Sequence, residues 1–473
     1  MPRLITLLAV SLIFGIATAQ DHSSYYTEPY QKKALEIYRT SIRFRTAQSH
    51  GQVPALANYL ADEFRAGGFP DEDVHVLPSK SAESEDIASL VVTYRGDISS
   101  TKKAILLLAH MDVVEALPED WERDPFTLIE EDAYFFGRGT LDDKYGTTVL
   151  TATFLRLKAE GFVPSRDLVI AFTGDEETGG TVSTRSLVTE HRQLIDAEFA
   201  LNADSGLGVL NGDDEAVSYL LDAAEKSSAT FELTVRNPGG HSSMPRADNA
   251  IYDLASILKK IEAHRFPVRS NEITRKYFEM MADASEGELA DAMRRFAKYP
   301  LDEEASDILY RYPSQVGLTR TTCVATMLTG GHARNALPQS ATATVNCRIF
   351  PGVEIADVEN ALRKAADNDA VEFEVLGNPF ASPASPLRED VLSATRKAVH
   401  ALYPGIPIIP AMVPWGTDGK HLRLAGIPTY GVNGWFLRPD EDSSHGLNER
   451  VSVKSFFGGL EHWNIILREL AGR

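Results

Sequence analysis

The segment Ala104-Ile105-Leu106-Leu107-Leu108-Ala109-His110-Met111-Asp112 joins an apolar, strand-like run to an imidazole and a carboxylate. The same pattern returns at residues 168–177, LVIAFTGDEE, where an apolar run ends in three acids. A helix-like amphipathic stretch, residues 148–160, lies between them. Apolar strands that alternate with helices predict a largely parallel sheet covered on both faces. Ligands bind such sheets where strand ends converge, so the sequence predicts an α/β fold with a site there.

Three further segments carry acid or imidazole groups of the same kind. They are Gly137-Arg138-Gly139-Thr140-Leu141-Asp142, Asn202-Ala203-Asp204-Ser205-Gly206 and Ser444-His445-Gly446. A hard or borderline divalent ion takes imidazole nitrogen and carboxylate oxygen as ligands. One such segment means little, but all of them together indicate a site that holds two metal ions.

The spacing within two of these segments indicates separate roles. On an extended segment, residues two apart point the same way, so Asp112 can accept the imidazole N–H that His110 does not use for metal. In a turn after a strand, Glu176 and Glu177 can approach one site, one as a ligand and the other as a general base. A solvated acidic turn is the alternative for residues 175–177, and their place directly after an apolar strand argues against it.

Length and composition set the class of protein. With 473 residues, 43% of them hydrophobic, the chain is long enough for two globular domains. Its net charge of −20 speaks against a nucleic-acid partner, because phosphates would be repelled.

The N-terminal residues have the pattern of a targeting segment. Arg3, the apolar run 4–16 and Ala17-Thr18-Ala19 predict a signal peptide over residues 1–19. The run is shorter than the ~20 residues of a spanning helix, which argues against stable membrane insertion. We therefore expect a secreted protein, located in a bacterial periplasm.

The pattern changes near Glu225 and returns to strand–helix alternation from Asp390. The elements in between follow the order β-α-β-β-α-β, which predicts a ferredoxin-like α+β lid. We expect this lid, residues 225–380, to be inserted between two parts of a catalytic domain, residues 24–224 and 381–473. Within it, residues 270–315 predict added helices, for which a structural role is favoured over gating of the substrate.

Cys323 and Cys347 are the only cysteines, which excludes a disulfide scaffold and a thiolate metal site. They lie in two strand-like runs, residues 321–328 and 341–350. A hairpin centred near Asn335 would place them opposite each other, and an oxidising compartment would permit a bridge. Because register cannot be fixed from the sequence, two buried free thiols are the favoured expectation.

These motifs together resemble the M20 metallopeptidase family. The resemblance rests on His110-Met111-Asp112-Val113-Val114, Gly137-Arg138-Gly139 with Asp142 and Lys144, Thr173-Gly174-Asp175-Glu176-Glu177, Gly239-Gly240-His241-Ser242-Ser243 and Ser444-His445-Gly446. It covers nearly all of the mature chain, in the family's order, and is strongest to the carboxypeptidase and N-acyl-amino-acid hydrolase branch.

The resemblance implies a zinc-peptidase-like catalytic domain with two zinc ions, for which cobalt or manganese is a possible substitute. Asp142 would bridge the ions, and the other ligands would be His110 and Asp204 on one ion, Glu177 and His445 on the other. Glu176 would act as general base and Asp112 would support His110. Asp143 would be structural, and Tyr145 stands where the family usually has Gly, which leaves the packing there open.

Residues of the lid and of a later loop complete the implied site. His241 resembles the family's donor to the tetrahedral oxyanion, which often reaches across a dimer interface; a turn histidine is the alternative. Arg348 and Asn335 match the family's substrate-binding residues, and a strand-end salt bridge is the alternative for Arg348. Gly416 and Thr417, in Gly416-Thr417-Asp418-Gly419, match a substrate-binding loop.

The sequence thus predicts a dinuclear zinc hydrolase that cleaves amide bonds of short peptides or N-acyl amino acids with a free carboxylate. A homodimer through the lid is expected from the resemblance. An aminopeptidase or dipeptidase is the alternative among enzymes, and a non-catalytic binding protein that retains the fold is the alternative of another class.

Overall fold

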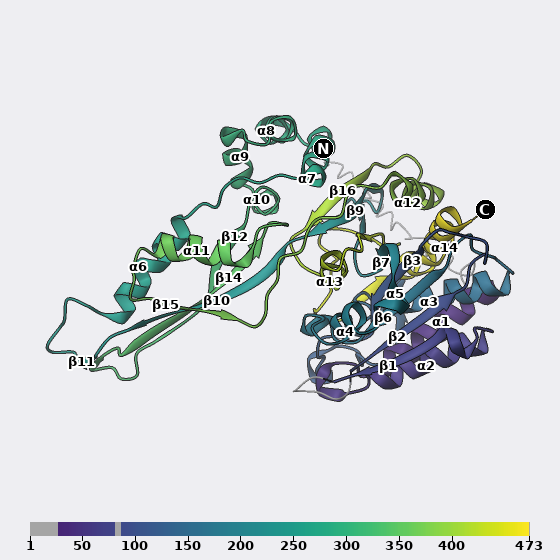
Figure 1. The fold of residues 1–473 in the computed structure, drawn as a ribbon, viewed down its shortest axis with the longest axis horizontal. Coiled ribbons are helices and arrows are strands. Elements are labelled where there is room, and N and C mark those ends of the chain that lie inside the picture. The colour runs from purple at the N-terminus through teal and green to yellow at the C-terminus, as the bar shows by residue number, and fades with distance from the viewer. Residues whose placement is uncertain (1–26, 81–86, 473) are drawn as a thin grey trace, which may run out of the picture.

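The computed structural model describes residues 27–80 and 87–472, so the expected signal peptide lies outside the described residues. The chain forms a body built on a large mixed sheet and a lid that extends away from it (Figure 1). Along the body sheet the strands run β1(Val74–Ser79), β2(Ile87–Tyr94), β6(Leu168–Thr173), β3(Ala104–His110), β7(Ala197–Asn202), β17(Thr429–Gly431), β9(Ala216–Glu225), β8(Leu207–Leu210) and β18(Phe436–Leu437), with β16(Ile408–Val413) also on β9.

The centre of the body sheet is parallel, as the sequence predicts. Strand β3 pairs in parallel with β6 on one side and with β7 on the other. Its alternate residues enter different cores: Ile105 and Leu107 join one apolar cluster, while Leu106 and Leu108 join another. A strand with both faces covered must be apolar throughout, which explains the continuous apolar run.

Helices cover both faces of this sheet. One face packs on α1(Pro29–Arg43), α2(Val53–Ala66), α3(Lys144–Ala159), α12(Glu389–Leu402) and α14(Val453–Ala471). The other packs on α4(Ser183–Thr189), α5(Arg192–Ile195) and α13(Gly419–Leu424). A small sheet of β4(Ile129–Glu131), β5(Tyr134–Phe136) and β19(Arg450–Ser452) completes the body.

The lid has the ferredoxin-like arrangement expected from its element order. Its sheet runs β12–β14–β10–β15, with every neighbouring pair antiparallel. Two helices cover one face of it and share its apolar core. The elements are β10(Ser227–Arg236), α6(Ala250–Ala263), β12(Thr322–Gly330), β14(Ser340–Ile349), α11(Ile355–Ala366) and β15(Glu372–Leu376), with a short ribbon of β11(Gly240–His241) and β13(Ala336–Leu337) at the outer end (Figure 1).

The added segment at 270–315 is helical and packs on the body. It contains α7(Glu272–Met281), α8(Gly287–Lys298), α9(Glu303–Tyr310) and α10(Pro313–Val316). Helix α7 packs against β16, and Phe278 and Phe296 belong to the same apolar cluster as the body's main core. This packing supports the structural role.

The expectation of free thiols is wrong, because the structure joins Cys323 to Cys347 in a disulfide. The two residues are directly opposite each other on β12 and β14. Only this register, which the sequence does not specify, brings the two sulfur atoms together.

Within the described ranges, no helix combines the length and the apolar character needed to cross a membrane.

Candidate metal centre

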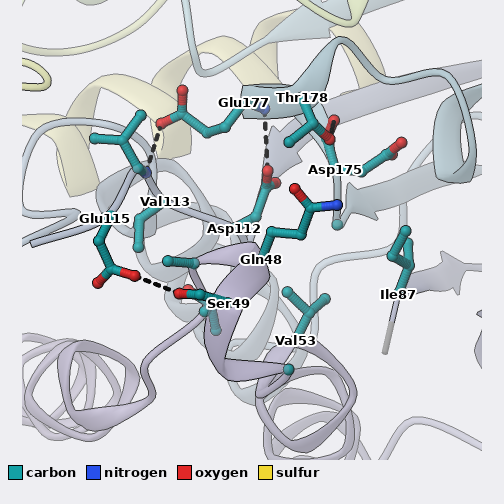
Figure 2. A pocket seen from close by; sticks show the side chains of 15 residues that line it. Gln48, Ser49, Val53, Ile87, Asp112, Val113, Glu115, Asp175, Glu177 and Thr178 are labelled. Carbon is teal, nitrogen blue, oxygen red and sulfur yellow. Dashed lines mark hydrogen bonds between the residues drawn. The ribbon is translucent and has the colours of Figure 1, made fainter. Parts of the chain in front are cut away.

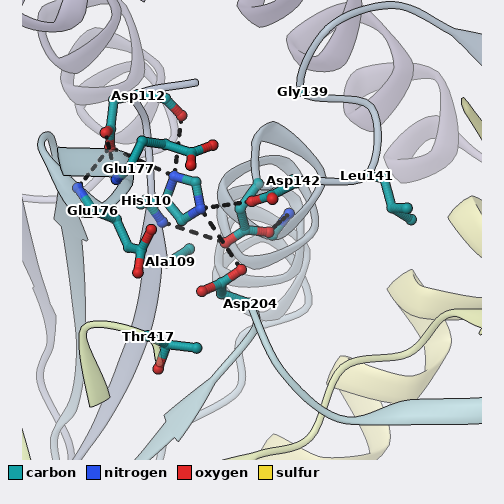
Figure 3. Close-up of polar contacts among 12 residues, drawn as sticks. Ala109, His110, Asp112, Gly139, Leu141, Asp142, Glu176, Glu177, Asp204 and Thr417 are labelled. Atoms are coloured by element: carbon teal, nitrogen blue, oxygen red, sulfur yellow. Dashed lines mark hydrogen bonds and ion pairs between the residues drawn. The ribbon is translucent and has the colours of Figure 1, made fainter. Parts of the chain in front are cut away.

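Five side chains from distant segments meet near the ends of the central strands. Figure 3 shows four of them, His110, Asp142, Glu177 and Asp204. His110 ends β3, Asp204 follows β7, and Asp142 lies just before α3. The His110 Nε2 atom is 2.8 Å from Asp142 Oδ1 and 3.6 Å from Asp204 Oδ1. His445 Nε2 is 3.0 Å from both Asp142 Oδ2 and Glu177 Oε2. The structure therefore brings together the five side chains that the sequence marks as metal ligands, with Asp142 between two groups.

Asp112 connects His110 to the turn that carries the two glutamates. The His110 Nδ1 atom is 3.0 Å from the main-chain oxygen of Asp112 and 3.5 Å from its carboxylate. That carboxylate accepts hydrogen bonds from the main-chain N–H groups of Glu176 and Glu177, at 3.2 and 3.0 Å. Asp112 thus orients the imidazole mainly through its carbonyl and uses its carboxylate to hold the 176–177 turn.

The loop before Asp142 is held by Glu449, a residue that the sequence gives no reason to select. Its fully buried carboxylate accepts hydrogen bonds from the N–H groups of Gly139, Leu141 and Asp142, and from the Arg138 guanidinium at 2.6 Å. A lone glutamate in a polar segment carries no periodicity or motif. Its partners lie about 310 positions away in the sequence, so only the folded chain reveals its role.

The electrostatics of the cluster call for bound cations. Burial, together with the charges of Asp142 and Glu177, raises the pKa of Asp204 to about 7. Burial acts to raise the pKa of Asp142 as well, but hydrogen bonds from His110 and His445 outweigh it and lower the pKa. Hydrogen bonds to Asp142 and Glu177 raise the pKa of His445 to about 10. So much buried negative charge in one place is costly unless cations compensate it.

The donor set fits divalent metal ions. One ligand atom from each of His110, Asp142 and Glu177 lies within 4.8 Å of the other two, and the same holds for His110, Asp143 and Asp204. Asp143 has partners inside the protein, since its carboxylate accepts the N–H of Gly146 at 2.9 Å and that of His110 at 3.3 Å. It caps α3, which favours a structural role for Asp143. The remaining imidazole and carboxylate groups suit zinc, cobalt or manganese.

Glu176 lies beside the cluster with its carboxylate uncommitted (Figure 3). Among the described residues, that carboxylate forms no hydrogen bond or ion pair, although the Glu176 N–H is fixed by Asp112. Burial, followed by the charges of Asp204 and Asp418, holds its pKa well above the usual range. A free acid with a raised pKa next to metal ligands suits a group that accepts and returns a proton.

Two cavities flank the cluster. The first, of about 290 Å³, lies on the side of Asp112 and Glu177, between them and the segment that includes Gln48, Ser49 and Val53 (Figure 2). The second, of about 260 Å³, is bordered by Asp142, Glu176, Asp204 and His445 themselves. Residues of the metal cluster therefore border two separate spaces.

The lid residues lie apart from the cluster of their own chain. His241 and Asn335 are in the β11–β13 region at the outer end of the lid, where the Asn335 carbonyl accepts the N–H of Ser242 at 3.0 Å (Figure 1). His241 is exposed, and its Nδ1 atom is 2.7 Å from the Ser243 hydroxyl. Within one chain, the described structure thus does not bring His241 or Asn335 to the metal ligands.

Arg348 and the loop at residues 416–417 lie closer to the junction of lid and body than His241 and Asn335 do. Arg348 is exposed near the inner end of β14, and its positive charge, added to the effect of burial, lowers the pKa of Lys226 to about 7. The Lys226 main-chain oxygen lies beside Gly416, which lines the second cavity. Thr417 also lines it, but its hydroxyl is engaged with Glu225 and Asn202 inside the protein. The Thr417 hydroxyl is therefore not free to bind substrate.

A cluster of histidines and carboxylates at the strand ends of an α/β sheet, with an uncommitted glutamate beside it, defines a metal-dependent hydrolase. Residues 106–469 match the family model described as peptidase family M20/M25/M40. The chain belongs to this family and is a metal-binding hydrolase of the metallopeptidase type.

The chain is similar to proteins with related activities. It is 33% identical over 359 residues to the N-fatty-acyl-amino acid synthase/hydrolase PM20D1 of Xenopus tropicalis, a match that covers 74% of this chain and 69% of the relative. It is 25% identical over 448 residues to aminoacylase-1 of Mus musculus, covering 93% and 95% of the two chains.

The fold is shared with solved structures of the family. The metallo-carboxypeptidase Sso-CP2 of Sulfolobus solfataricus has a TM-score of 0.67 at 17% identity, over 93% of this chain and 99% of the other. The di-peptidase Dug1p of Saccharomyces cerevisiae has a TM-score of 0.65 at 17% identity, over 93% and 96%.

Proposed function

We propose that this protein is a dinuclear zinc hydrolase that cleaves the amide bond of N-acyl amino acids or short peptides with a free carboxylate. The observation that carries the proposal is the position of Asp142, whose two carboxylate oxygens lie within 3.0 Å of His110 and His445 respectively. One carboxylate between two sets of donors is the arrangement that two neighbouring ions need. The similarity to PM20D1 and aminoacylase-1 supports N-acyl amino acids as the substrate class.

The chain's own residues would divide the chemistry as follows. His110, Asp204, Asp142, Glu177 and His445 would hold the ions, which when bound supply Lewis acidity toward the scissile carbonyl and toward a water molecule. Glu176 would take the proton of that water and return it to the leaving amine. Asp112 would keep His110 and the 176–177 turn in place through its two kinds of hydrogen bond.

We further propose that a second copy of the chain completes the site. His241 would donate to the oxyanion of the partner's substrate, because it lies far out on the lid of its own chain. Strand β12 is at the edge of the lid sheet and exposes Val324, Met327 and Leu328, each at least 60% accessible. An apolar edge strand of this kind is normally covered, which supports a homodimer through the lid. Arg348 would bind the substrate carboxylate through its guanidinium.

Export to an oxidising compartment is part of the proposal. The pattern of residues 1–19 predicts a signal peptide. The Cys323–Cys347 disulfide supports the same conclusion, since structural disulfides persist mainly in secreted and periplasmic proteins.

The activity is tested with the zinc-loaded enzyme on N-acetyl amino acids and on dipeptides with a free amino group, with and without a chelator. Hydrolysis of N-acylated substrates that the chelator abolishes and zinc restores is the expected result. Glu176→Gln should lower kcat about 10²–10⁴-fold while retaining bound zinc, measured by metal analysis. Glu119→Gln, at an exposed position, is the matched control. Cleavage of only the dipeptides with a free amino group would replace the proposal with an aminopeptidase or dipeptidase.

The dimer is tested by mixing His241→Ala with Glu176→Gln after subunit exchange. Each mixed dimer has one site with both groups intact, so activity should return to about one quarter of wild type. Light scattering that shows only monomer, or a mixture without recovered activity, contradicts the action of His241 across an interface.

A further inference from the structure

The second cavity beside the metal cluster is continuous with the reaction centre. Asp142, Asp204 and His445 form part of its wall. Its volume of about 260 Å³ is just below the ~300–1,000 Å³ of typical small-molecule sites. It therefore suits one side chain or one short acyl chain, attached next to a bond held at the cluster.

Most of the remaining wall is apolar. Leu207 and Leu220 are directly opposite each other on β8 and β9, and both are partly accessible from the cavity. The indole N–H of Trp435 is already paired, because its Nε1 donates to the Gly206 carbonyl at 2.7 Å. The other apolar residues are Val413, Leu437 and the half-exposed Trp415. The cavity thus offers hydrophobic contact and few hydrogen bonds.

The charged groups of the wall that do not belong to the metal site are acidic. They are Asp222 and Asp442, and the lining contains no lysine or arginine among the described residues. Asp222 is 3% exposed, and its Oδ2 atom accepts hydrogen bonds from the Ser205 hydroxyl and the Gly206 N–H. Its Oδ1 atom has no hydrogen-bond partner in the part of the chain that the structure describes. Away from the metal ligands, an anion placed in the cavity would meet this negative charge without a compensating lysine or arginine in the lining.

We propose that this cavity is the subsite for an uncharged, apolar group adjoining the scissile amide, and that it disfavours anionic groups. The inference rests on the proposed amide hydrolysis and adds the chemical class of one half of the substrate. An aliphatic acyl chain and an aliphatic amino-acid side chain share this chemistry. The substrate carboxylate would then lie outside the cavity, toward Arg348.

The test compares kcat/KM in two series of substrates at pH 8, with zinc-loaded enzyme. One series lengthens the acyl group from acetyl to butanoyl to pentanoyl on a fixed amino acid, and adds succinyl as the anionic member. The other keeps the acetyl group and varies the amino acid from alanine to norleucine, with glutamate as the anionic member. In the series whose variable group enters the cavity, kcat/KM should rise up to about fourfold per methylene, which is ~0.8 kcal/mol at ~1.4 kcal/mol per tenfold.

Variants of the lining residues test whether the cavity causes the gain in kcat/KM with chain length. Leu220→Phe narrows the cavity and should remove most of the gain with chain length, and Trp415→Ala, at its half-exposed rim, should reduce that gain. Val217→Phe, on the same strand but outside the lining, should keep the gain of the wild type. Asp222→Asn should narrow the preference for pentanoyl over succinyl, or for norleucine over glutamate, by at least about threefold.

The outcomes distinguish the proposed subsite from the proposed amide hydrolysis. A gain confined to the acyl series and lost in Leu220→Phe identifies the acyl chain as the occupant, and the same result in the second series identifies the side chain. Turnover of N-acetyl substrates without a gain in either series, or a gain unchanged in Leu220→Phe and Trp415→Ala, overturns the subsite and leaves the proposed hydrolysis intact. Absence of turnover for every substrate overturns both.

Discussion

Replacement of Glu449 by glutamine should destabilise the loop that carries Asp142. In the wild type, one buried carboxylate accepts three main-chain N–H groups and the Arg138 guanidinium, at 2.6–3.0 Å. Glutamine keeps the shape but has one acceptor oxygen, and its NH₂ group must face donors. About two donors would lose their acceptor, at ~1–3 kcal/mol each. We therefore expect the free energy of unfolding to fall by about 2–6 kcal/mol.

The same substitution should also weaken metal binding, because the Asp142 N–H is one of the groups that Glu449 holds. Removing such a supporting contact typically weakens metal affinity by ~10–100-fold. Urea unfolding of the metal-free protein measures the stability, and competition with a zinc indicator measures the affinity.

The matched control is Glu461→Gln, which removes an ion pair with Arg156 at a side chain that is 38% exposed. A partly exposed pair of this kind contributes ~0–1 kcal/mol, so this variant should unfold close to wild type. If Glu449→Gln unfolds within about 1 kcal/mol of wild type and binds zinc equally well, the loop does not depend on Glu449 and the reasoning is refuted.

Two further outcomes follow from buried groups away from the site. His462 is buried with its Nε2 atom 2.9 Å from the Val432 carbonyl, and burial lowers its pKa to about 4. The unfolded chain binds a proton on His462 more readily than the folded chain does. The contribution of neutral His462 to the free energy of unfolding is therefore complete above pH ~6.5 and is lost as the pH falls toward 4. The loss is about 2.5 kcal/mol at pH ~4.5. His462→Gln should therefore lose less unfolding free energy than wild type between pH 7 and 4.5, measured by urea titrations at each pH. An equal loss in the two proteins would contradict this. The Cys323–Cys347 disulfide closes a loop of 24 residues, so its reduction should lower the free energy of unfolding by about 3 kcal/mol. An intact mass that shows two free thiols without reductant would contradict this expectation.

Much of the fold and of the metal site could be predicted from the sequence, because local patterns carry that information. The apolar run 104–109 shows a strand buried on both faces, and the alternation at 230–235 shows a strand exposed on one face. Metal ligands directly after strands meet because parallel strands end at one edge. The sequence therefore predicts that His110 and Glu177 lie near each other.

The remaining features depend on which distant segments pack together. The carboxylate of Glu449 is defined by partners about 310 residues earlier in the chain, and no local signal marks it. The disulfide depends on a strand register that a shift of one residue would break. The apolar wall of the cavity is formed by side chains of β8, β9, β16 and β18 and by Trp415 and Trp435 from loops, none of which forms a pocket alone. The sequence by itself thus determined the class of fold and the metal chemistry, since both follow from periodicity and residue type. Only the tertiary structure decided how that chemistry is supported and which group can lie beside it, since these depend on contacts between residues far apart in the chain.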